Sequence, residues 1–472
     1  MTDAKREGDK KVPEDIDYDE GIQWSSPMTL HERTVYLVHQ FLAECGYERT
    51  LATLLEEERA VRRRPQLIPR GGELLALVQE HEDLEAASMA AQRPQGPPPC
   101  PVLAEPPARG FPGPSAPEST PVLRGAHRGN VLCVRVAPAT VPGATVLVTA
   151  AADRSVVCTR IVHGDKGGEV KEEQPLWRVD VKSPVLDVAC CAANGLLAVA
   201  TMDGHCWVLE AATGAVVQTL RAHAKYVVAA VWATPDAFAT SSRDHTVCVW
   251  ARPPHSTEPF ALHQTLDFPA NVECLCVEHF GSSSSLDKED DKDKDKERTE
   301  EDQDGDQDEA VILACVRDDC WVHRLVVGRG RVRDERYFNV NGGDDEHVSF
   351  AVLALTRDPA HGRLLCASTD RDRLAVYDLG AGGRLVRTLY GAPNDEMSQP
   401  RHCWLAGSEH VASTALDGCV YVWELRSQRV VARLRGHTRV VRDVAFDPAN
   451  NTIFSASFDG TIRLWPSTVP LP

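Results

Sequence analysis

The feature of this sequence that most constrains its fold is the last repeat, which runs from Leu434 to Trp465. Its apolar residues fall into three short runs, separated by the turn signals Asp447-Pro448 and Asp459-Gly460. Alternation with a period of two predicts strands, and Asp-Gly between two such runs predicts a tight turn. The repeat therefore predicts three antiparallel strands, at 440–446, 453–457 and 461–465.

A Gly-His pair at the start of a unit of about forty residues, and a Trp at its end, are typical of WD-repeat propeller blades. Gly436-His437 and Trp465 occupy these positions, and the stretch resembles that family. The resemblance implies a buried relay in which Trp465 donates a hydrogen bond to Ser455, Ser455 to His437, and His437 to Asp459. Such a network fixes the register of a blade only if every member has a partner.

Seven blade-like units follow one another between residues 121 and 466. The third unit holds a second complete set, His223, Thr240, Asp244 and Trp250. Partial sets are His127, Thr149 and Asp153, with Thr159 in place of Trp, and Ser413, Asp417 and Trp423, without a Gly-His. The other units are degenerate: their candidate turn residues are Asp203-Gly204, Asp318, and Asp370 or Asp372, and Tyr377 replaces a Trp. The units together predict a mainly β fold, a seven-bladed WD40 β-propeller.

The chain ends soon after the third strand of the last unit. A fourth strand must then come from elsewhere, and Pro121-Val122-Leu123-Arg124 is placed to supply it. This pairing closes the ring and removes its exposed edges.

A helical segment precedes the propeller, after a polar stretch (1–26) that has the composition of a disordered chain. Thr29 to Glu32 form a capping box, and Gly46 ends the helix that follows. The piece at 27–60 resembles a LisH motif. The positions that match the motif are Leu30, Val35, Phe41, Leu42, Gly46, Tyr47, Thr50, Ala52, Leu54 and Glu57. The positions that we expect at a dimer interface are Leu30, Val35, Val38, Phe41, Leu42, Gly46, Tyr47, Leu51 and Leu54.

Two helices this short cannot bury their apolar faces alone. In the LisH family the partner is a second copy, so the resemblance implies a homodimer; the alternative is a helical hairpin docked on the chain's own propeller. A short amphipathic helix at 70–88 is a candidate extension of the dimer as a coiled coil. The Pro-rich segment at 89–120 is typical of an extended linker.

The charge of the chain is concentrated in one place. The formal net charge is −18, but residues 287–309 hold 14 acidic and 5 basic side chains, a net of 5 − 14 = −9. This stretch belongs to an insertion at 281–309 in the fourth unit, whose low complexity predicts disorder. An acidic total argues against direct nucleic-acid binding. Half of that charge lies in the insertion, so the folded body is far less acidic than the total and the argument from net charge to partner is weakened.

No sequence motif indicates catalysis. Nucleophilic triads, phosphate-binding Gly loops and zinc-ligand spacings are not visible, so we expect no enzyme activity, cofactor or metal. The fifteen cysteines lie mostly in apolar runs, which is typical of buried thiols in a reducing compartment. No run reaches the length of a membrane helix, so we expect a soluble cytoplasmic or nuclear protein that does not bind membranes.

The end of the sixth unit suggests one specific partner. Trp423-Glu424-Leu425-Arg426 resembles the WDxR box of propellers that serve as substrate receptors of cullin-4 ubiquitin ligases. That resemblance implies that Trp423, Glu424 and Arg426 contact the ligase adaptor. The alternative is an ordinary blade end, because short motifs of this kind arise in unrelated blades.

These features together predict a non-catalytic scaffold. It self-associates through the LisH motif and binds protein or peptide partners on its propeller. The layout of the modules resembles that of the lissencephaly-type and transducin-β-like LisH–WD proteins. The second hypothesis is a substrate receptor of a cullin-4 ligase.

Overall fold

The computed structural model describes residues 121–138, 143–164, 170–253, 259–279, 310–328, 330–342, 348, 350–394 and 398–466. The predicted polar stretch (1–26), LisH motif (27–60), amphipathic helix (70–88) and linker (89–120) lie outside these residues, as does the acidic insertion (281–309). In the part of the chain that is described, no helix is both long and apolar enough to cross a bilayer.

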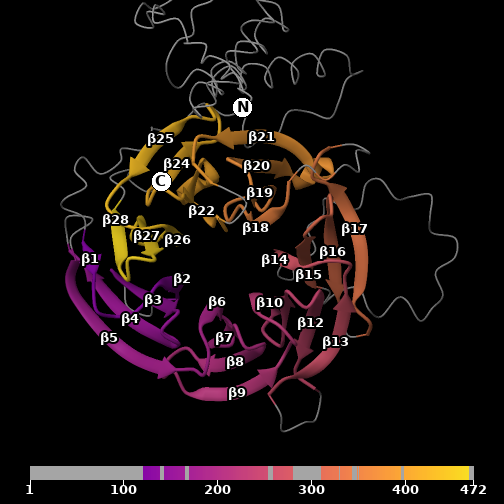
Figure 1. Ribbon diagram of the computed structural model, residues 1–472, viewed down its shortest axis with the longest axis horizontal. Coiled ribbons are helices and arrows are strands. Elements are labelled where there is room, and N and C mark those ends of the chain that lie inside the picture. The colour runs from indigo at the N-terminus through magenta and orange to yellow at the C-terminus, as the bar shows by residue number, and fades with distance from the viewer. Residues whose placement is uncertain are drawn as a thin grey trace, which may run out of the picture. The chain divides into compact units, whose positions relative to one another are not determined.

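Seven antiparallel sheets of four strands each form the blades of a closed ring (Figure 1). Blade 1 consists of β2 (Val131–Ala137), β3 (Ala144–Ala151), β4 (Ser155–His163) and β5 (Val170–Asp180). Blade 2 consists of β6 (Val185–Cys191), β7 (Leu196–Thr201), β8 (His205–Glu210) and β9 (Val216–Arg221). Blade 3 consists of β10 (Val227–Thr234), β11 (Ala237–Ser242), β12 (Thr246–Ala251) and β13 (Ala261–Asp267).

The remaining blades repeat the same order of strands. Blade 4 consists of β14 (Val272–His279), β15 (Ala310–Val316), β16 (Trp321–Val327) and β17 (Arg333–Asn339). Blade 5 consists of β18 (Val352–Arg357), β19 (Leu364–Thr369), β20 (Arg373–Asp378) and β21 (Arg384–Tyr390), with the 3₁₀ helix η3 at Leu379–Ala381. Blade 6 consists of β22 (His402–Trp404), β23 (His410–Thr414), β24 (Val420–Glu424) and β25 (Val430–Leu434), with η4 at Ala406–Ser408.

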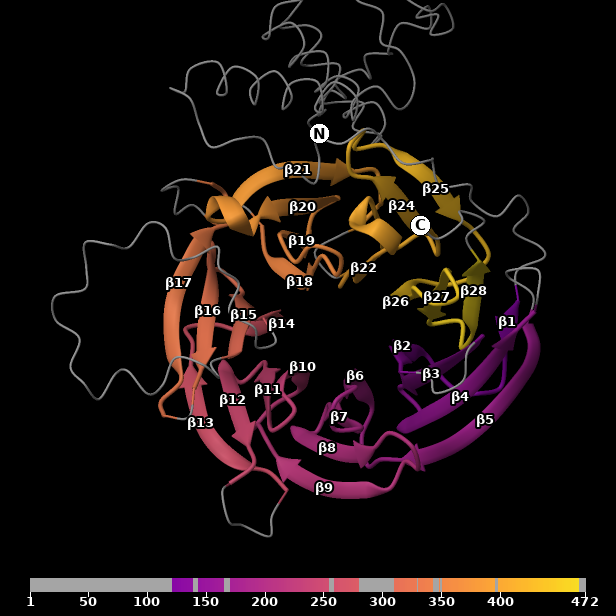
Figure 2. The same cartoon turned by 180° about the vertical axis from the view of Figure 1, so that it is seen from behind.

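Blade 7 is built from both ends of the propeller. It consists of β26 (Val441–Asp447), β27 (Thr452–Ser457) and β28 (Ile462–Pro466), with β1 (Val122–Leu123) as its fourth strand. Strands β1 and β28 lie side by side in both views (Figures 1 and 2), with Val122 opposite Arg463 and Leu123 opposite Ile462. The predicted closing strand is therefore confirmed.

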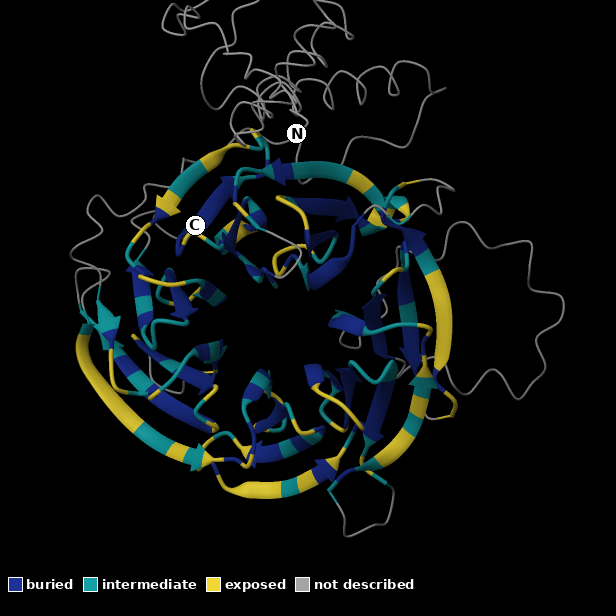
Figure 3. Ribbon diagram, viewed as in Figure 1, coloured by how far each residue is buried: buried dark blue, intermediate teal, exposed yellow. Residues whose placement is uncertain are grey.

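Burial follows the position of a strand within its blade. The second strand is almost completely buried, as in Thr452–Ser457 of β27, because each blade lies between two others. The fourth strand is mostly exposed, as in Val216–Arg221 of β9, where only Leu220 is buried. The outer strands accordingly carry most of the exposed residues of the sheets (Figure 3). The pattern explains why second strands read as continuous apolar or small-residue runs.

The hydrophobic core lies between the blades. Seven clusters of buried residues are present in the described residues, and each joins two successive blades. The cluster at the closure unites Leu123 of β1 and Phe454 of β27 with Leu147 of β3. A blade therefore gains most of its apolar burial from its neighbours rather than from its own sheet.

Polar side chains of the outer strands add a second kind of tie. Gln218 of β9 accepts a hydrogen bond from the Phe260 N–H (3.0 Å) and donates one to the Phe260 carbonyl (2.8 Å) in the next blade. Side chains at the corresponding position in other blades also bond to the backbone of the following blade; they are Trp177, Gln264 and Arg387. These bonds fix the outer rim of the ring.

The closure can be tested by Leu123→Asp. Leu123 is 4% exposed, so the substitution places a carboxylate in the cluster between blades 7 and 1. We expect the free energy of unfolding to fall by roughly 3–5 kcal/mol, because a buried unpaired charge is strongly destabilising. Thermal unfolding followed by circular dichroism measures the loss. Val122→Thr, at a partly exposed position, is the control, and equal melting of the two variants would contradict the closure.

Candidate functional site

The polar network of blade 7 contains all four residues expected from the sequence. His437 lies in the connection before β26, with Nδ1 2.9 Å from Asp459 Oδ2 and Nε2 2.8 Å from Ser455 Oγ. The Trp465 indole N–H donates to the same Ser455 oxygen at 2.8 Å. The hydroxyl of Ser455 is thus left to donate to His437 Nε2, which places the imidazole proton on Nδ1, facing the carboxylate.

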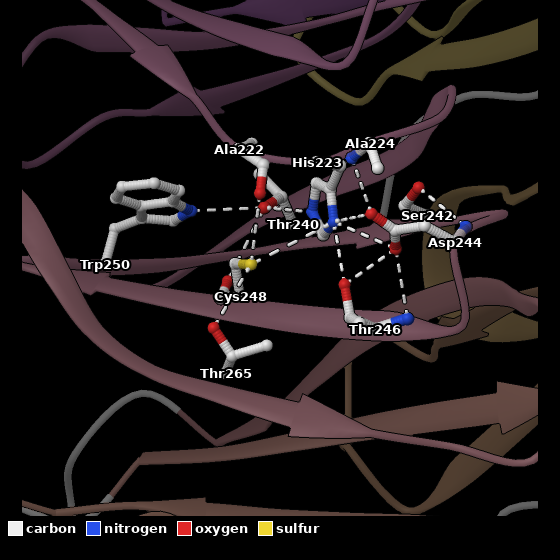
Figure 4. Close-up of polar contacts among 10 residues, drawn as sticks. All are labelled: Ala222, His223, Ala224, Thr240, Ser242, Asp244, Thr246, Cys248, Trp250 and Thr265. Atoms are coloured by element: carbon white, nitrogen blue, oxygen red, sulfur yellow. Dashed lines mark hydrogen bonds and ion pairs between the residues drawn. The ribbon is translucent and has the colours of Figure 1, made fainter.

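Blade 3 repeats this arrangement (Figure 4). His223 Nε2 lies 2.9 Å from Thr240 Oγ1, and its Nδ1 lies 3.2 Å from both carboxylate oxygens of Asp244. The Trp250 indole N–H donates to Thr240 Oγ1 at 3.1 Å. Asp244 also accepts a hydrogen bond from the Thr246 hydroxyl at 2.7 Å.

Blade 1 holds the same network without the indole. His127 Nε2 lies 2.9 Å from Thr149 Oγ1, and its Nδ1 lies 3.3 Å from Asp153 Oδ1. Thr159 pairs with Leu147 in the strand register, at the position that Trp465 and Trp250 occupy opposite Ile453 and Phe238. The network of blade 1 therefore ends at Thr149, whereas those of blades 3 and 7 continue to a tryptophan.

A hydroxyl two residues after the aspartate is a further member that the sequence reasoning missed. Ser155, Thr246 and Thr461 each donate to the carboxylate of their own blade, at 2.6, 2.7 and 2.6 Å. The same hydroxyls lie 2.8, 2.9 and 3.3 Å from Nδ1 of the histidine. The signal was present as the pattern Asp-x-Ser/Thr in these three units.

The three networks hold an uncharged histidine beside an ionised aspartate. Burial lowers the pKa of His127, His223 and His437, although the nearby carboxylates oppose this shift. Burial alone would raise the pKa of Asp459, but hydrogen bonds from Thr461, the Thr438 N–H and His437 outweigh it and lower that pKa to about 2. The carboxylate therefore works as a fully used acceptor rather than as a catalytic base.

The sixth blade does not form the network, although Ser413, Asp417 and Trp423 have the expected spacing. The Trp423 indole N–H donates to the Tyr390 carbonyl at 2.7 Å, and Ser413 donates to the Arg401 carbonyl at 3.1 Å. Asp417 accepts the hydroxyl of Tyr421 at 2.8 Å. Ala392 stands in the sequence where the other connections carry histidine, so the central member is missing and each side chain bonds elsewhere.

In blade 4 the carboxylate that acts in the turn is Asp319, not Asp318 as the sequence suggested. Asp319 accepts the Trp321 N–H at 2.9 Å and lies 3.1 Å from His323 Nε2, whereas Asp318 adopts a left-handed backbone with φ of 61°. The turn is one residue longer here, since Ile312 pairs with Leu325 while Ile453 pairs with Trp465. His323, which the sequence reasoning missed, also lies 2.9 Å from Asp334.

Blade 5 uses its two candidate turn aspartates separately. Asp370 accepts the Ala351 N–H at 3.0 Å, and Asp372 accepts the Asn394 N–H at 2.6 Å. Tyr377, in the place of a Trp, donates its hydroxyl proton to the Val340 carbonyl at 2.9 Å. Each of these groups ties a neighbouring connection to the blade.

The residues of the WDxR-like box are largely covered. Trp423 is fully buried, and the Arg426 side chain is 14% exposed, 3.4 Å from Glu409. Glu424 accepts the hydroxyl of Ser427 at 2.6 Å. Arg426 Nη2 thus pairs within blade 6, while its Nη1 is buried without a hydrogen-bond partner among the described residues.

In the described part of the chain, no group of His, Cys, Asp or Glu is arranged to hold a metal ion. The thirteen described cysteines form no disulfide with one another, and all but Cys190 and Cys403 are buried.

Comparison with known proteins identifies the repeats. Residues 214–251 and 428–466 match the family "WD domain, G-beta repeat", and these segments contain Trp250 and Trp465. The chain is 26% identical over 162 residues to apoptotic protease-activating factor 1 of Mus musculus, covering 34% of this chain and 12% of that protein. It is 32% identical over 156 residues to a LEC14B homolog of Prunus armeniaca (28% and 30%) and 28% identical over 132 residues to the WD repeat-containing protein 26 homolog of Drosophila melanogaster (26% and 20%).

Each similarity spans no more than 30% of the relative's length. With the seven four-stranded sheets, the matches show that this chain contains WD40 repeats folded as a seven-bladed propeller.

The network can be tested with a matched pair of serine substitutions. Ser455→Ala leaves the Trp465 indole and His437 Nε2 without their shared partner, so we expect a loss of about 2–4 kcal/mol in the free energy of unfolding. Ser413→Ala, at the same blade position outside a relay, should cost less than about 1 kcal/mol, because the Arg401 carbonyl keeps the Thr414 N–H. Denaturant unfolding compares the two, and equal losses would show that the relay adds nothing.

The histidines also predict how stability depends on pH. Burial lowers the pKa of six described histidines from 6.5, and it lowers that of His402 to about 4. Burial also acts to lower the pKa of His323, but Asp334 and Asp319 outweigh it and raise that pKa. The unfolded chain therefore binds more protons than the folded one below pH 6.5, so the free energy of unfolding should fall between pH 6.5 and about 4. His323 opposes this trend: its contribution is present below pH 6.5 and is lost as the pH rises through its raised pKa.

Denaturant titrations across this pH range measure the slope. In His402→Asn the slope should be shallower, whereas His361→Asn, at an exposed position, should retain it. A stability that rose on acidification in this range would contradict the assignment of neutral histidines.

Proposed function

We propose that this protein is a non-catalytic scaffold that binds protein or peptide partners on its propeller. The observation that carries the proposal is the closed ring itself. The histidines and aspartates of its networks bond to one another and to the backbone, so their role is to stabilise the fold. What the ring offers to other molecules is a rigid surface of loops. Loops held by a rigid scaffold are the usual place for binding residues.

The scaffold self-associates through the LisH-like segment at 27–60, and the coiled-coil extension at 70–88 adds to the dimer. This part of the proposal rests on the sequence, where two short amphipathic helices need a partner to bury their apolar faces. Two propellers joined in this way gain avidity for a partner that presents two binding segments, provided that the linkers span both sites. Cytoplasm and nucleus both suit such an assembly.

A scaffold is favoured over the ligase-receptor alternative by the position of Arg426. Its guanidinium is paired with Glu409 and is mostly covered, so an adaptor would have to break this pair to reach it. Leu425 beside it is fully buried. An affinity capture from cell lysate in which a cullin-4 adaptor is lost on Arg426→Ala, with melting unchanged, would reverse this preference.

Self-association is tested by light scattering of the full chain after size exclusion. We expect a mass near twice 51.7 kDa for the wild type and near 51.7 kDa for Leu42→Glu combined with Leu54→Glu, because a charge on the shared apolar face opposes pairing. The thermal unfolding of the propeller should be the same in both. Gln66→Glu, outside the motif, is the control, and a monomeric wild type would contradict the dimer.

A further inference from the structure

Five exposed arginines gather where blades 6, 7 and 1 meet. They are Arg435 and Arg439 in the connection from β25 to β26, Arg124 and Arg128 in the connection from β1 to β2, and Arg154 in the turn between β3 and β4. We call this set the junction arginines. In an antiparallel blade the turn between the second and third strands lies at the same end as the start of the first strand, so all five occupy one face of the ring.

Contacts between the segments show that this set is continuous. A Cβ on Gly418, in the blade 6 turn, would lie 3.0 Å from the Arg439 carbonyl oxygen. The Thr438 N–H donates to Asp459 in the blade 7 turn at 3.0 Å. The turn of blade 6, the connection at 435–440 and the turn of blade 7 therefore lie side by side.

The same pattern continues into blade 1. A Cβ on Gly460, in the blade 7 turn, would lie 3.5 Å from the Gly129 carbonyl oxygen. The Arg128 N–H donates to Asp153, in the blade 1 turn, at 2.8 Å. The five arginines thus line one strip of adjoining loops.

Charge is segregated along this strip. The side chains of Asp153 and Asp459 are 11% and 8% exposed and serve the histidine networks. None of the junction arginines forms an ion pair or a side-chain hydrogen bond with another described residue. Asp417 is exposed at the blade 6 end, where its Oδ2 accepts the Tyr421 hydroxyl. Asp180, 72% exposed beside the blade 1 turn, is paired with Arg178 at 3.1 Å. Among the described residues, the strip therefore presents an excess of unpaired positive charge to solvent.

The backbone at Arg154 is strained. Its φ is 67°, in the left-handed region; the corresponding turn positions are Gly204, Gly418 and Gly460 in blades 2, 6 and 7, and His245, with φ of 73°, in blade 3. A non-glycine residue there costs roughly 1–2 kcal/mol. No hydrogen bond or ion pair of the Arg154 side chain with a described residue offsets that cost, so Arg154→Gly removes the charge and relieves the backbone together.

We propose that the junction arginines bind an acidic peptide segment of a protein partner, through its carboxylate or phosphate groups. The proposal rests on the proposed function and names the surface and the chemistry of the ligand. Arginine suits this role because its planar guanidinium pairs with either group through two hydrogen bonds.

A short peptide fits this face better than an extended nucleic acid. Beyond the junction, the turns of blades 2, 4 and 5 expose Asp203, Asp318 and Asp372 on the same face. A polyanion that followed the ring would meet these carboxylates, whereas a peptide confined to blades 6, 7 and 1 would not. The partner is thus expected to present its acidic groups within one short segment.

The test is fluorescence anisotropy of labelled peptides with the purified full chain. One probe copies residues 287–309, with its net charge of −9, and a second carries phosphoserine at the acidic positions. A third has Asn or Gln in place of nine of the 14 acidic residues, so that its five remaining acidic residues balance its five basic ones and it is neutral. We expect the first or the second to bind, with an affinity that falls from low to high salt, and the neutral probe not to bind.

Three substitutions remove the charge with little disturbance of the fold. Arg154→Gly relieves the left-handed strain, Arg128→Thr copies the residue at the same place in the blade 7 connection, Thr438, and Arg439→Ser shortens an exposed side chain. Each should weaken acidic-peptide binding about two- to fivefold, as expected for exposed charge pairs. Arg154→Gly should do so while melting at the same temperature as the wild type or higher.

Lys225→Ser is the matched control, because Lys225 is exposed two residues after His223, as Arg439 is after His437. Unchanged peptide affinity in the triple arginine variant, or an equal loss of affinity in Lys225→Ser, would overturn the proposal. Tighter binding of a single-stranded oligoribonucleotide than of either acidic peptide at the junction would also overturn it. A cellular partner that cross-linked to another part of the propeller would leave the scaffold function intact and refute this surface alone.

Discussion

Packing between blades is the interaction on which the rest of this structure depends. Each second strand is buried on both sides, and each of the seven hydrophobic clusters belongs to two successive blades. A single blade cannot bury both faces of its own sheet, so the ring is stable only when it is closed. The closure therefore depends strongly on β1, because its two residues complete the contact between blades 7 and 1.

The histidine networks are an addition to this packing rather than its cause. They form in blades 1, 3 and 7. Among the described residues, blades 2 and 5 contain four strands in the same register without such a network. In blade 6 the alanine at position 392 lets the Trp423 indole turn to the Tyr390 carbonyl, while the indole stays buried. Burial of the large side chain is thus retained when its hydrogen-bond partner changes.

The sequence predicted what depends on spacing. The positions of Asp459 and Trp465 relative to Ser455, and the need for a strand to close the ring, follow from a fixed geometry that all blades share. It did not predict contacts that depend on which neighbour is present. In blade 4, for example, Asp319 accepts the hydrogen bond within the turn because that turn is one residue longer. The outer-rim ties were missed because Trp177, Gln218 and Arg387 share a position but no residue type. The burial of Arg426 was not predictable either, because its partner Glu409 lies in the connection from β22 to β23, outside the motif.

The networks also explain how the charge of the ring is displayed. Aspartates at the turns of blades 1 and 7 bond to histidine and backbone N–H groups, while Arg154 and the arginines of the adjoining connections are exposed. One face of an acidic protein thereby becomes locally basic.

Hydrogen–deuterium exchange of the full chain tests most directly whether packing between blades, and not the histidine relay, holds the ring together. The account predicts that β7 and β19, in blades without the relay, exchange as slowly as β27, which has it, because all three are buried on both sides. Much faster exchange in β7 and β19, with slow exchange confined to blades 1, 3 and 7, would contradict it and make the relay the main source of stability.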